Sequence, residues 1–128
     1  MAEIGVVVVR AADGIVKPQG FTYFHGVSKE AVGATRLAMH IGVLPPGMVG
    51  PAHTHAEHET AVYVLEGEAL IRWGTGLEHE VCAAAGDFVF VPAGMPHQAI
   101  NPSASEPCRT VIARTDPSES EAAVMVRQ

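Results

Sequence analysis

Residues 51–59 read Pro-Ala-His-Thr-His-Ala-Glu-His-Glu, and this stretch decides how the chain is interpreted. In an extended segment the side chains at positions i and i+2 point to the same side, so His53 and His55 are predicted to converge on one ion. Neutral imidazole nitrogens bind Fe, Mn, Zn, Ni or Cu, and a nearby carboxylate such as Glu59 favours a divalent ion. His97 is a further candidate ligand later in the chain. The alternative, an exposed polar loop, is disfavoured by the surrounding glycines and prolines.

The composition indicates one globular domain. The chain has 128 residues, of which 48% are hydrophobic and 17% are charged, which is enough apolar material for a core and too little charge for disorder. The net charge of −6 comes without a basic run, so nucleic acid and anionic membranes are predicted not to be partners. No apolar run could span a bilayer, and the N-terminus lacks the pattern of a signal peptide. We therefore expect a cytoplasmic protein, with Cys82 and Cys108 as free thiols.

Glycines and prolines separate short apolar runs along the chain, which is typical of all-β domains. Many short strands joined by tight turns predict a sandwich or a barrel. Residues 28–33 are compatible with a loop or with one helical turn. Strands are predicted at residues 4–10, 21–25, 34–44, 60–65, 67–73, 77–84, 88–91, 97–100 and 110–114.

Two spaced motifs carry a resemblance to a known family. The first motif is Gly47-x5-His53-x-His55-x3-Glu59-x7-Gly67, and the second is Gly86-x5-Pro92-x-Gly94-x2-His97-x3-Asn101. Together they resemble the two signature motifs of the cupin superfamily, and the short interval between them is similar to that of small cupins. Gly67 is predicted to turn the chain between two strands. Asn101 is predicted to close a turn through hydrogen bonds to local backbone, which is a structural role.

The resemblance implies an all-β fold, namely the double-stranded β-helix, an RmlC-like jelly-roll barrel made by a single cupin domain. That domain is expected to span residues 1–128, with the barrel core at about 34–114 and a C-terminal tail at 115–128. Homodimers are usual in this family. We expect a homodimer that covers the valine-rich residues 6–9 and the face that carries Tyr63 and Leu65.

The resemblance also implies ligands for a divalent transition metal ion: His53, His55 and His97. The fourth ligand stays open. In the family's register the ligating carboxylate stands seven residues before the closing glycine, where this chain has Thr60. Glu59 takes that role if the loop reaches the strand by a bulge, whereas strict alternation places His58 on the same side as Thr60. A site of four histidines is therefore an alternative to the carboxylate site. The remaining alternatives are Glu57 as the fourth ligand or no fourth ligand.

These features predict a metal-binding protein that acts on a small polar or carboxylated molecule. The resemblance implies a metal-dependent oxygenase, isomerase or decarboxylase, with an ion that serves as Lewis acid or redox centre. The alternative is a non-catalytic cupin that binds or senses a small molecule or a metal, and a third is a vestigial motif without an ion. An arginine inside the barrel would hold an anionic substrate group, and Arg72 is a candidate for this role.

Overall fold

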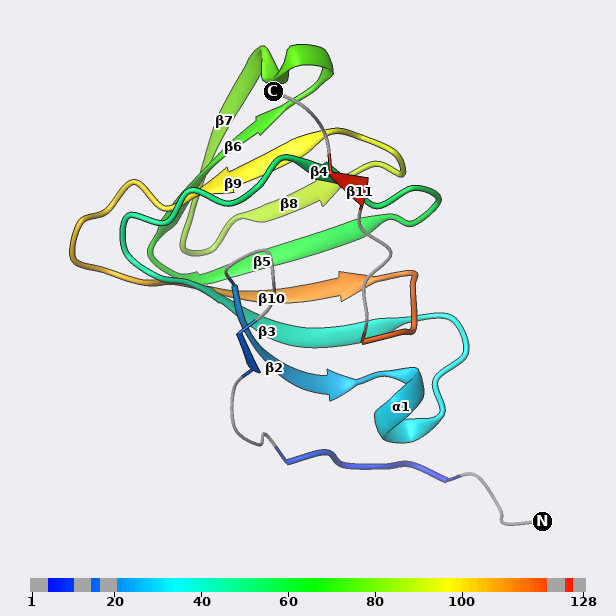
Figure 1. Cartoon of the computed structure of the whole chain (residues 1–128). Helices are drawn as coiled ribbons and strands as arrows, with labels where there is room; N and C mark the ends of the chain where they lie inside the picture. Colours follow the sequence, from blue (N-terminus) through cyan, green and yellow to red (C-terminus); the bar gives the residue numbers. More distant parts are fainter. Residues whose placement is uncertain (1–4, 11–14, 17–20, 120–123, 126–128) are drawn as a thin grey trace.

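The computed structural model describes residues 5–10, 15–16, 21–119 and 124–125, and almost all of its regular structure is antiparallel sheet (Figure 1). The first sheet has the strand order β1 (Ile15–Val16), β2 (Thr22–Val27), β3 (Ala38–Leu44), β10 (Cys108–Arg114), β5 (Thr60–Glu66) and β8 (Phe88–Val91). The second sheet has the order β11 (Val124–Met125), β4 (His53–Thr54), β9 (His97–Ile100), β6 (Glu68–Trp73) and β7 (His79–Ala84). This architecture confirms the all-β jelly-roll prediction.

Helical structure is confined to short turns in the described residues. Helix α1 (Lys29–Val32) begins after Ser28, whose side chain accepts a hydrogen bond from the Ala31 amide, and it ends at Gly33 in the left-handed conformation. The second helical turn is the 3-10 helix η1 (Thr75–Leu77). No helix in the described part of the chain is long and apolar enough to cross a membrane.

The predicted strand at the N-terminus is the clearest difference from the sequence prediction. Residues 5–10 form no strand, and Val6, Val7 and Val8 are exposed. In Figure 1 this segment runs below β2 at the lower edge of the view. Valine-rich segments favour strands only where a pleated neighbour is present to pack on them. Residues 6–9 therefore have the composition of a strand, but they pair with no strand in the described residues.

The two sheets enclose an apolar interior whose small residues leave a cavity. Along β10, buried and half-buried residues alternate strictly, which places Cys108, Thr110, Ile112 and Arg114 on the inner side. The buried core also includes larger apolar residues such as Phe21, Leu44 and Val64, and the small residues Ala69 and Ala83. These core residues line a cavity in the interior, and the site described below forms part of its wall.

The structure confirms the structural roles predicted for two motif residues, Gly67 and Asn101. Gly67 has φ 80°, and a Cβ there would lie 2.5 Å from the Pro107 carbonyl oxygen, so the turn between β5 and β6 requires glycine. Asn101 is almost fully buried. Its amide nitrogen donates to the carbonyl oxygens of Leu44 (3.0 Å) and Glu106 (2.9 Å), and its side-chain oxygen accepts from the Ser103 amide (3.0 Å). These bonds tie the second motif to the end of β3.

The residues after β10 link the two sheets. The Lys29 amide donates to the Pro117 carbonyl oxygen at 2.7 Å, and the Ser28 hydroxyl donates to the Glu119 carboxylate at 2.6 Å. Further on, β11 pairs with β4, and Met125 stands opposite His53 in that ladder. The last described strand therefore lies directly beside the strand that carries the first histidine of the motif.

Candidate metal centre

Three histidines from the two motifs meet at one end of the barrel. His53 lies on β4, and its register partner is His97 at the start of β9, which brings the two motifs together. One ring nitrogen from each of His53, His55 and His97 lies within 4.8 Å of the other two. His53 and His55 are buried, and His97 is half-buried. The i and i+2 positions of the first motif thus converge with the histidine of the second, and no other group of this kind occurs in the described residues.

Backbone carbonyls fix the orientation of two of these rings. His53 Nδ1 lies 2.9 Å from the Pro51 carbonyl oxygen, and His97 Nδ1 lies 2.8 Å from the Met95 carbonyl oxygen. A carbonyl only accepts, so both Nδ1 atoms carry a proton, and in the neutral form of each ring Nε2 keeps the lone pair. The Nε2 atoms of His53 and His55 lie 3.1 Å apart. Hydrogen bonds from Nδ1 to backbone carbonyls are how proteins orient metal-binding imidazoles.

Burial lowers the pKa of two of these rings, those of His55 and His97. Burial, and next the positive charge of Arg114, lowers the pKa of His55 from 6.5 to about 2. Burial, and next the neighbouring His53, lowers the pKa of His97 from 6.5 to about 4, against a raising effect of its bond to the Met95 carbonyl. Metal ions bind the neutral form of imidazole. Three rings with converging nitrogens, two of them with a pKa lowered by burial, are therefore a donor set that fits a divalent transition metal ion.

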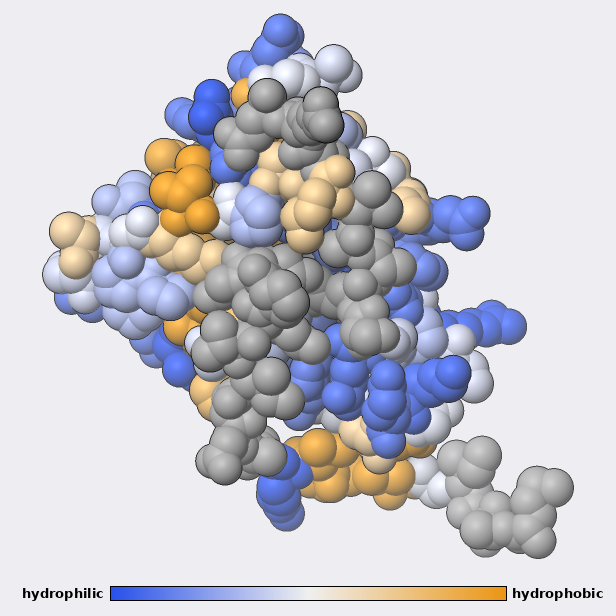
Figure 2. Space-filling model, in the orientation of Figure 1, coloured by the Kyte–Doolittle hydropathy of each residue, from blue (hydrophilic) through white to orange (hydrophobic). Residues whose placement is uncertain are grey.

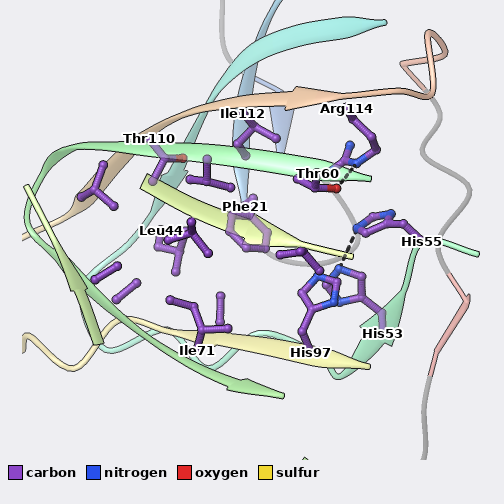
Figure 3. Close-up of a pocket in the computed structure, with 17 residues that line it drawn as sticks. Phe21, Leu44, His53, His55, Thr60, Ile71, His97, Thr110, Ile112 and Arg114 are labelled. Atoms are coloured by element: carbon purple, nitrogen blue, oxygen red, sulfur yellow. Dashed lines mark hydrogen bonds between the residues drawn. The ribbon is translucent and has the colours of Figure 1, made fainter. Parts of the chain in front are cut away.

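The histidines form part of the wall of an apolar cavity of about 90 Å³ (Figure 3). Aliphatic and aromatic side chains from both sheets line most of it, among them Phe21, Leu44, Ile71 and Ile112. In Figure 3 the three imidazoles lie together at one end, with Arg114 and Thr60 on the opposite sheet beside His55. The site is thus a polar end on an otherwise apolar chamber.

Arg114 is the charged residue of this chamber, and the sequence analysis missed it. The residue is 5% exposed, and its Nε donates to the Thr60 hydroxyl at 3.1 Å. The two residues are register partners in the β10–β5 ladder. Arg72, the arginine considered from the sequence, is exposed instead. A signal was available, because Arg114 has the same parity as the apolar Ile112 on a strand with strict alternation.

The structure does not bring the candidate fourth ligands to the three histidines. Glu59 is exposed, and its backbone N–H donates a hydrogen bond to the Thr115 hydroxyl oxygen at 3.0 Å. His58 is partly exposed, and its Nε2 lies 3.8 Å from the Asp116 carboxylate. Ala56 has φ 35°, and the amide of His58 bonds to the His55 carbonyl at 2.7 Å, so a tight turn separates the histidine pair from β5. After this turn Thr60 is buried and lines the cavity.

The other histidines lie apart from this group. His25 and His40 are register partners in the β2–β3 ladder with ring centroids 5.6 Å apart. His79 is exposed, and its ring stacks on Trp73 at 4.2 Å. It therefore offers a matched control for substitutions at the candidate site.

Comparisons with known proteins agree with this architecture. A family model described as "Cupin domain" matches residues 40–113. An oxalate oxidase structure aligns with a TM-score of 0.71 at 20% identity, covering 90% of this chain and 60% of that one. The polyketide cyclase RemF from Streptomyces resistomycificus aligns with a TM-score of 0.68 at 21% identity, covering 94% of this chain and 78% of that one.

A third structure, the formate complex of oxalate decarboxylase from Lactobacillus farciminis, aligns with a TM-score of 0.73 at 16% identity and covers 89% of this chain and 33% of that one. This chain therefore spans about 60% of the oxalate oxidase chain and one third of the decarboxylase chain. No curated protein sequence matches it significantly. At these identities the structures show the fold alone, while the family model covers more than half of the chain. With both motifs meeting in the barrel as well, the chain belongs to the cupin domain family.

Proposed function

We propose that this chain is a metal-dependent cupin enzyme that acts on a small polar or carboxylated molecule, as an oxygenase, decarboxylase or isomerase. The observation that supports this most is the convergence of three imidazoles on the wall of a cavity. The proposed ligand set is His53, His55 and His97. A bound transition metal ion would supply Lewis-acid or redox chemistry, and three protein ligands leave one to three positions for water, dioxygen or substrate.

The protein's own contribution is orientation and exclusion of water. The carbonyls of Pro51 and Met95 hold two rings so that their Nε2 lone pairs remain available. The apolar walls limit water around a bound molecule, which strengthens the electrostatic contacts made there. Arg114 places a positive charge beside His55 and favours a substrate that carries an anionic group.

Metal content and turnover test this proposal in sequence. We expect close to one transition metal ion per chain after purification without chelator, by inductively coupled plasma mass spectrometry. His97→Ala should lower the metal content strongly, whereas His79→Ala should not, because His79 is exposed and apart from the group. Equal metal content in the two variants would contradict the site. Turnover is then assayed on the loaded protein with hydroxy acids, keto acids and diols, and metal binding without turnover would indicate the non-catalytic cupin.

We also propose a homodimer, in keeping with the exposed apolar surface. Residues 6–9 form an apolar patch at the lower edge of the molecule in Figure 2. On the outer side of β5 and β8, Leu65, Phe88 and Phe90 are exposed, and Tyr63 packs on Phe88 with ring centroids 4.7 Å apart. Burial of such surface in a second copy would be favourable. Light scattering at micromolar concentration should give the mass of a dimer, and a monomer would refute this assignment.

A further inference from the structure

His55 is held differently from the other two members of the histidine group. The Nδ1 atoms of His53 and His97 lie 2.9 and 2.8 Å from backbone carbonyl oxygens. The Nδ1 atom of His55 is buried and has no hydrogen-bond partner in the described part of the chain. Proteins usually orient a metal-binding imidazole through a hydrogen bond at its second nitrogen. Because His55 lacks that bond, the placement of its ring depends more strongly on the backbone that carries it.

The backbone next to His55 makes a strained turn. Ala56 has φ 35°, a conformation that residues other than glycine adopt only where the surrounding structure holds them in it. The His58 amide closes the turn by donating to the His55 carbonyl oxygen at 2.7 Å. On one side the turn approaches the second motif, since a Cβ at Gly94 would lie 3.3 Å from the Ala56 carbonyl oxygen. Strain of this kind persists only if contacts from other elements hold the turn.

The chain that follows β10 supplies such a contact. The ladder between β10 and β5 ends with the register pair Arg114 and Thr60. Beyond it, the Thr115 amide donates to the Glu59 carbonyl oxygen at 3.1 Å, and the Glu59 amide donates to the Thr115 hydroxyl oxygen at 3.0 Å. In a regular antiparallel pair both acceptors are backbone carbonyls. Here the hydroxyl of Thr115 replaces one of them, so the ladder extends past both strands toward His55.

The preceding residue of the turn contacts the same segment. His58 Nδ1 lies 3.5 Å from the Thr115 hydroxyl oxygen, and His58 Nε2 lies 3.8 Å from the Asp116 carboxylate. A hydroxyl that accepts a hydrogen bond still has a proton to donate, so one hydroxyl serves both Glu59 and His58. Thr115 therefore contacts two consecutive residues of the turn.

We propose that Thr115 is a positioning residue for the metal ligand His55. Its hydroxyl holds the strained turn at Ala56, and this turn places the imidazole that lacks a carbonyl partner. The inference rests on the proposed function for the presence of the ion, but the placement of His55 can be measured without one. It gives a role in metal binding to an exposed threonine that lies outside both sequence motifs.

The first test measures the Zn²⁺ affinity of the full chain by competition with a chromogenic chelator. Thr115→Val keeps the branched shape of the side chain and removes the hydroxyl, so it should bind Zn²⁺ about fivefold more weakly than the wild type. Thr115→Ser keeps the hydroxyl and should bind like the wild type. Thr22→Val should also bind like the wild type, and it is the matched control because Thr22 lies at the opposite end of the first sheet, across from Val43.

The second test detects the placement of the ring in the metal-free protein by nuclear magnetic resonance. The imidazole resonances of His55 should shift in Thr115→Val and return in Thr115→Ser. Those of His79 should stay unchanged, because His79 is exposed and its ring stacks on Trp73. Since Thr115 is exposed, its variants should keep the fold, and unchanged His79 resonances verify this.

Wild-type Zn²⁺ affinity and unchanged His55 resonances in Thr115→Val overturn the positioning role and leave the proposed metal site intact. An equal loss of affinity in Thr115→Val and Thr115→Ser also overturns it, because the serine retains the hydroxyl. A wild type that takes up no metal, together with shifted His55 resonances in Thr115→Val, overturns the proposed function and supports the placement of this ring by Thr115.

Discussion

Acidification of the metal-free protein should lower its stability through His97. The pKa of His97 is lowered from 6.5 to about 4 in the folded state, so the unfolded chain binds more protons between these values. The free energy of unfolding therefore has its full value above pH 6.5 and falls as the pH decreases toward 4. For one histidine with these pKa values the loss between pH 7 and pH 5 is about 2 kcal/mol. His55 adds a loss of the same sign, because its pKa is also lowered by burial.

Urea denaturation of the metal-free protein at the two pH values measures this loss. Exposed carboxylates contribute a background, so the informative quantity is the difference between variants. His97→Asn removes the titrating ring, and its loss of stability between pH 7 and pH 5 should be smaller than that of the wild type by about 2 kcal/mol. His79→Asn should behave like the wild type, because His79 is exposed. Parallel pH dependence of wild type and His97→Asn would refute the burial of a neutral His97.

Two further predictions concern the turns that hold the motifs in place. Gly67→Ala should lower the free energy of unfolding clearly more than Gly86→Ala. Both glycines have positive φ, which costs about 1–2 kcal/mol for alanine. Only at Gly67 would the new Cβ lie 2.5 Å from a carbonyl oxygen. Equal midpoints in urea would contradict the close approach of Pro107. Asn101→Ala should destabilise by about 2–4 kcal/mol, because the variant leaves the buried carbonyl of Leu44 without its donor. Thermal unfolding measures this loss, and a change below about 0.5 kcal/mol would show that the three hydrogen bonds contribute little.

The sequence predicted the parts of the site that local spacing determines. The i and i+2 spacing of His53 and His55 is a local feature, the resemblance to the cupin motifs added His97, and the three residues lie together in the structure. The position of β5 relative to the histidine pair was harder to predict from the sequence, because it depends on a turn at Ala56 with positive φ. That turn is not visible as a glycine in the sequence, and it decides that Thr60 points inward while Glu59 is exposed.

Long-range pairing was the other limit. Residues 6–9 have strand composition, yet strand formation depends on a partner that no local pattern reveals. Arg114 was missed for a related reason, because an arginine at the end of a strand is usually taken as exposed. Only the pairing of β10 between β3 and β5 shows that its inner side is continuous with the chamber. The fourth ligand stays a prediction that metal analysis of Glu59 and His58 variants can test.

The ladder between β11 and β4 couples the far end of the chain to the proposed ion. Met125 stands opposite His53 in this ladder, so an ion that stabilises β4 by binding His53 should also stabilise the last described strand. Occupancy of the histidine group should therefore protect the C-terminal region against proteases, and cleavage there should in turn weaken retention of the ion.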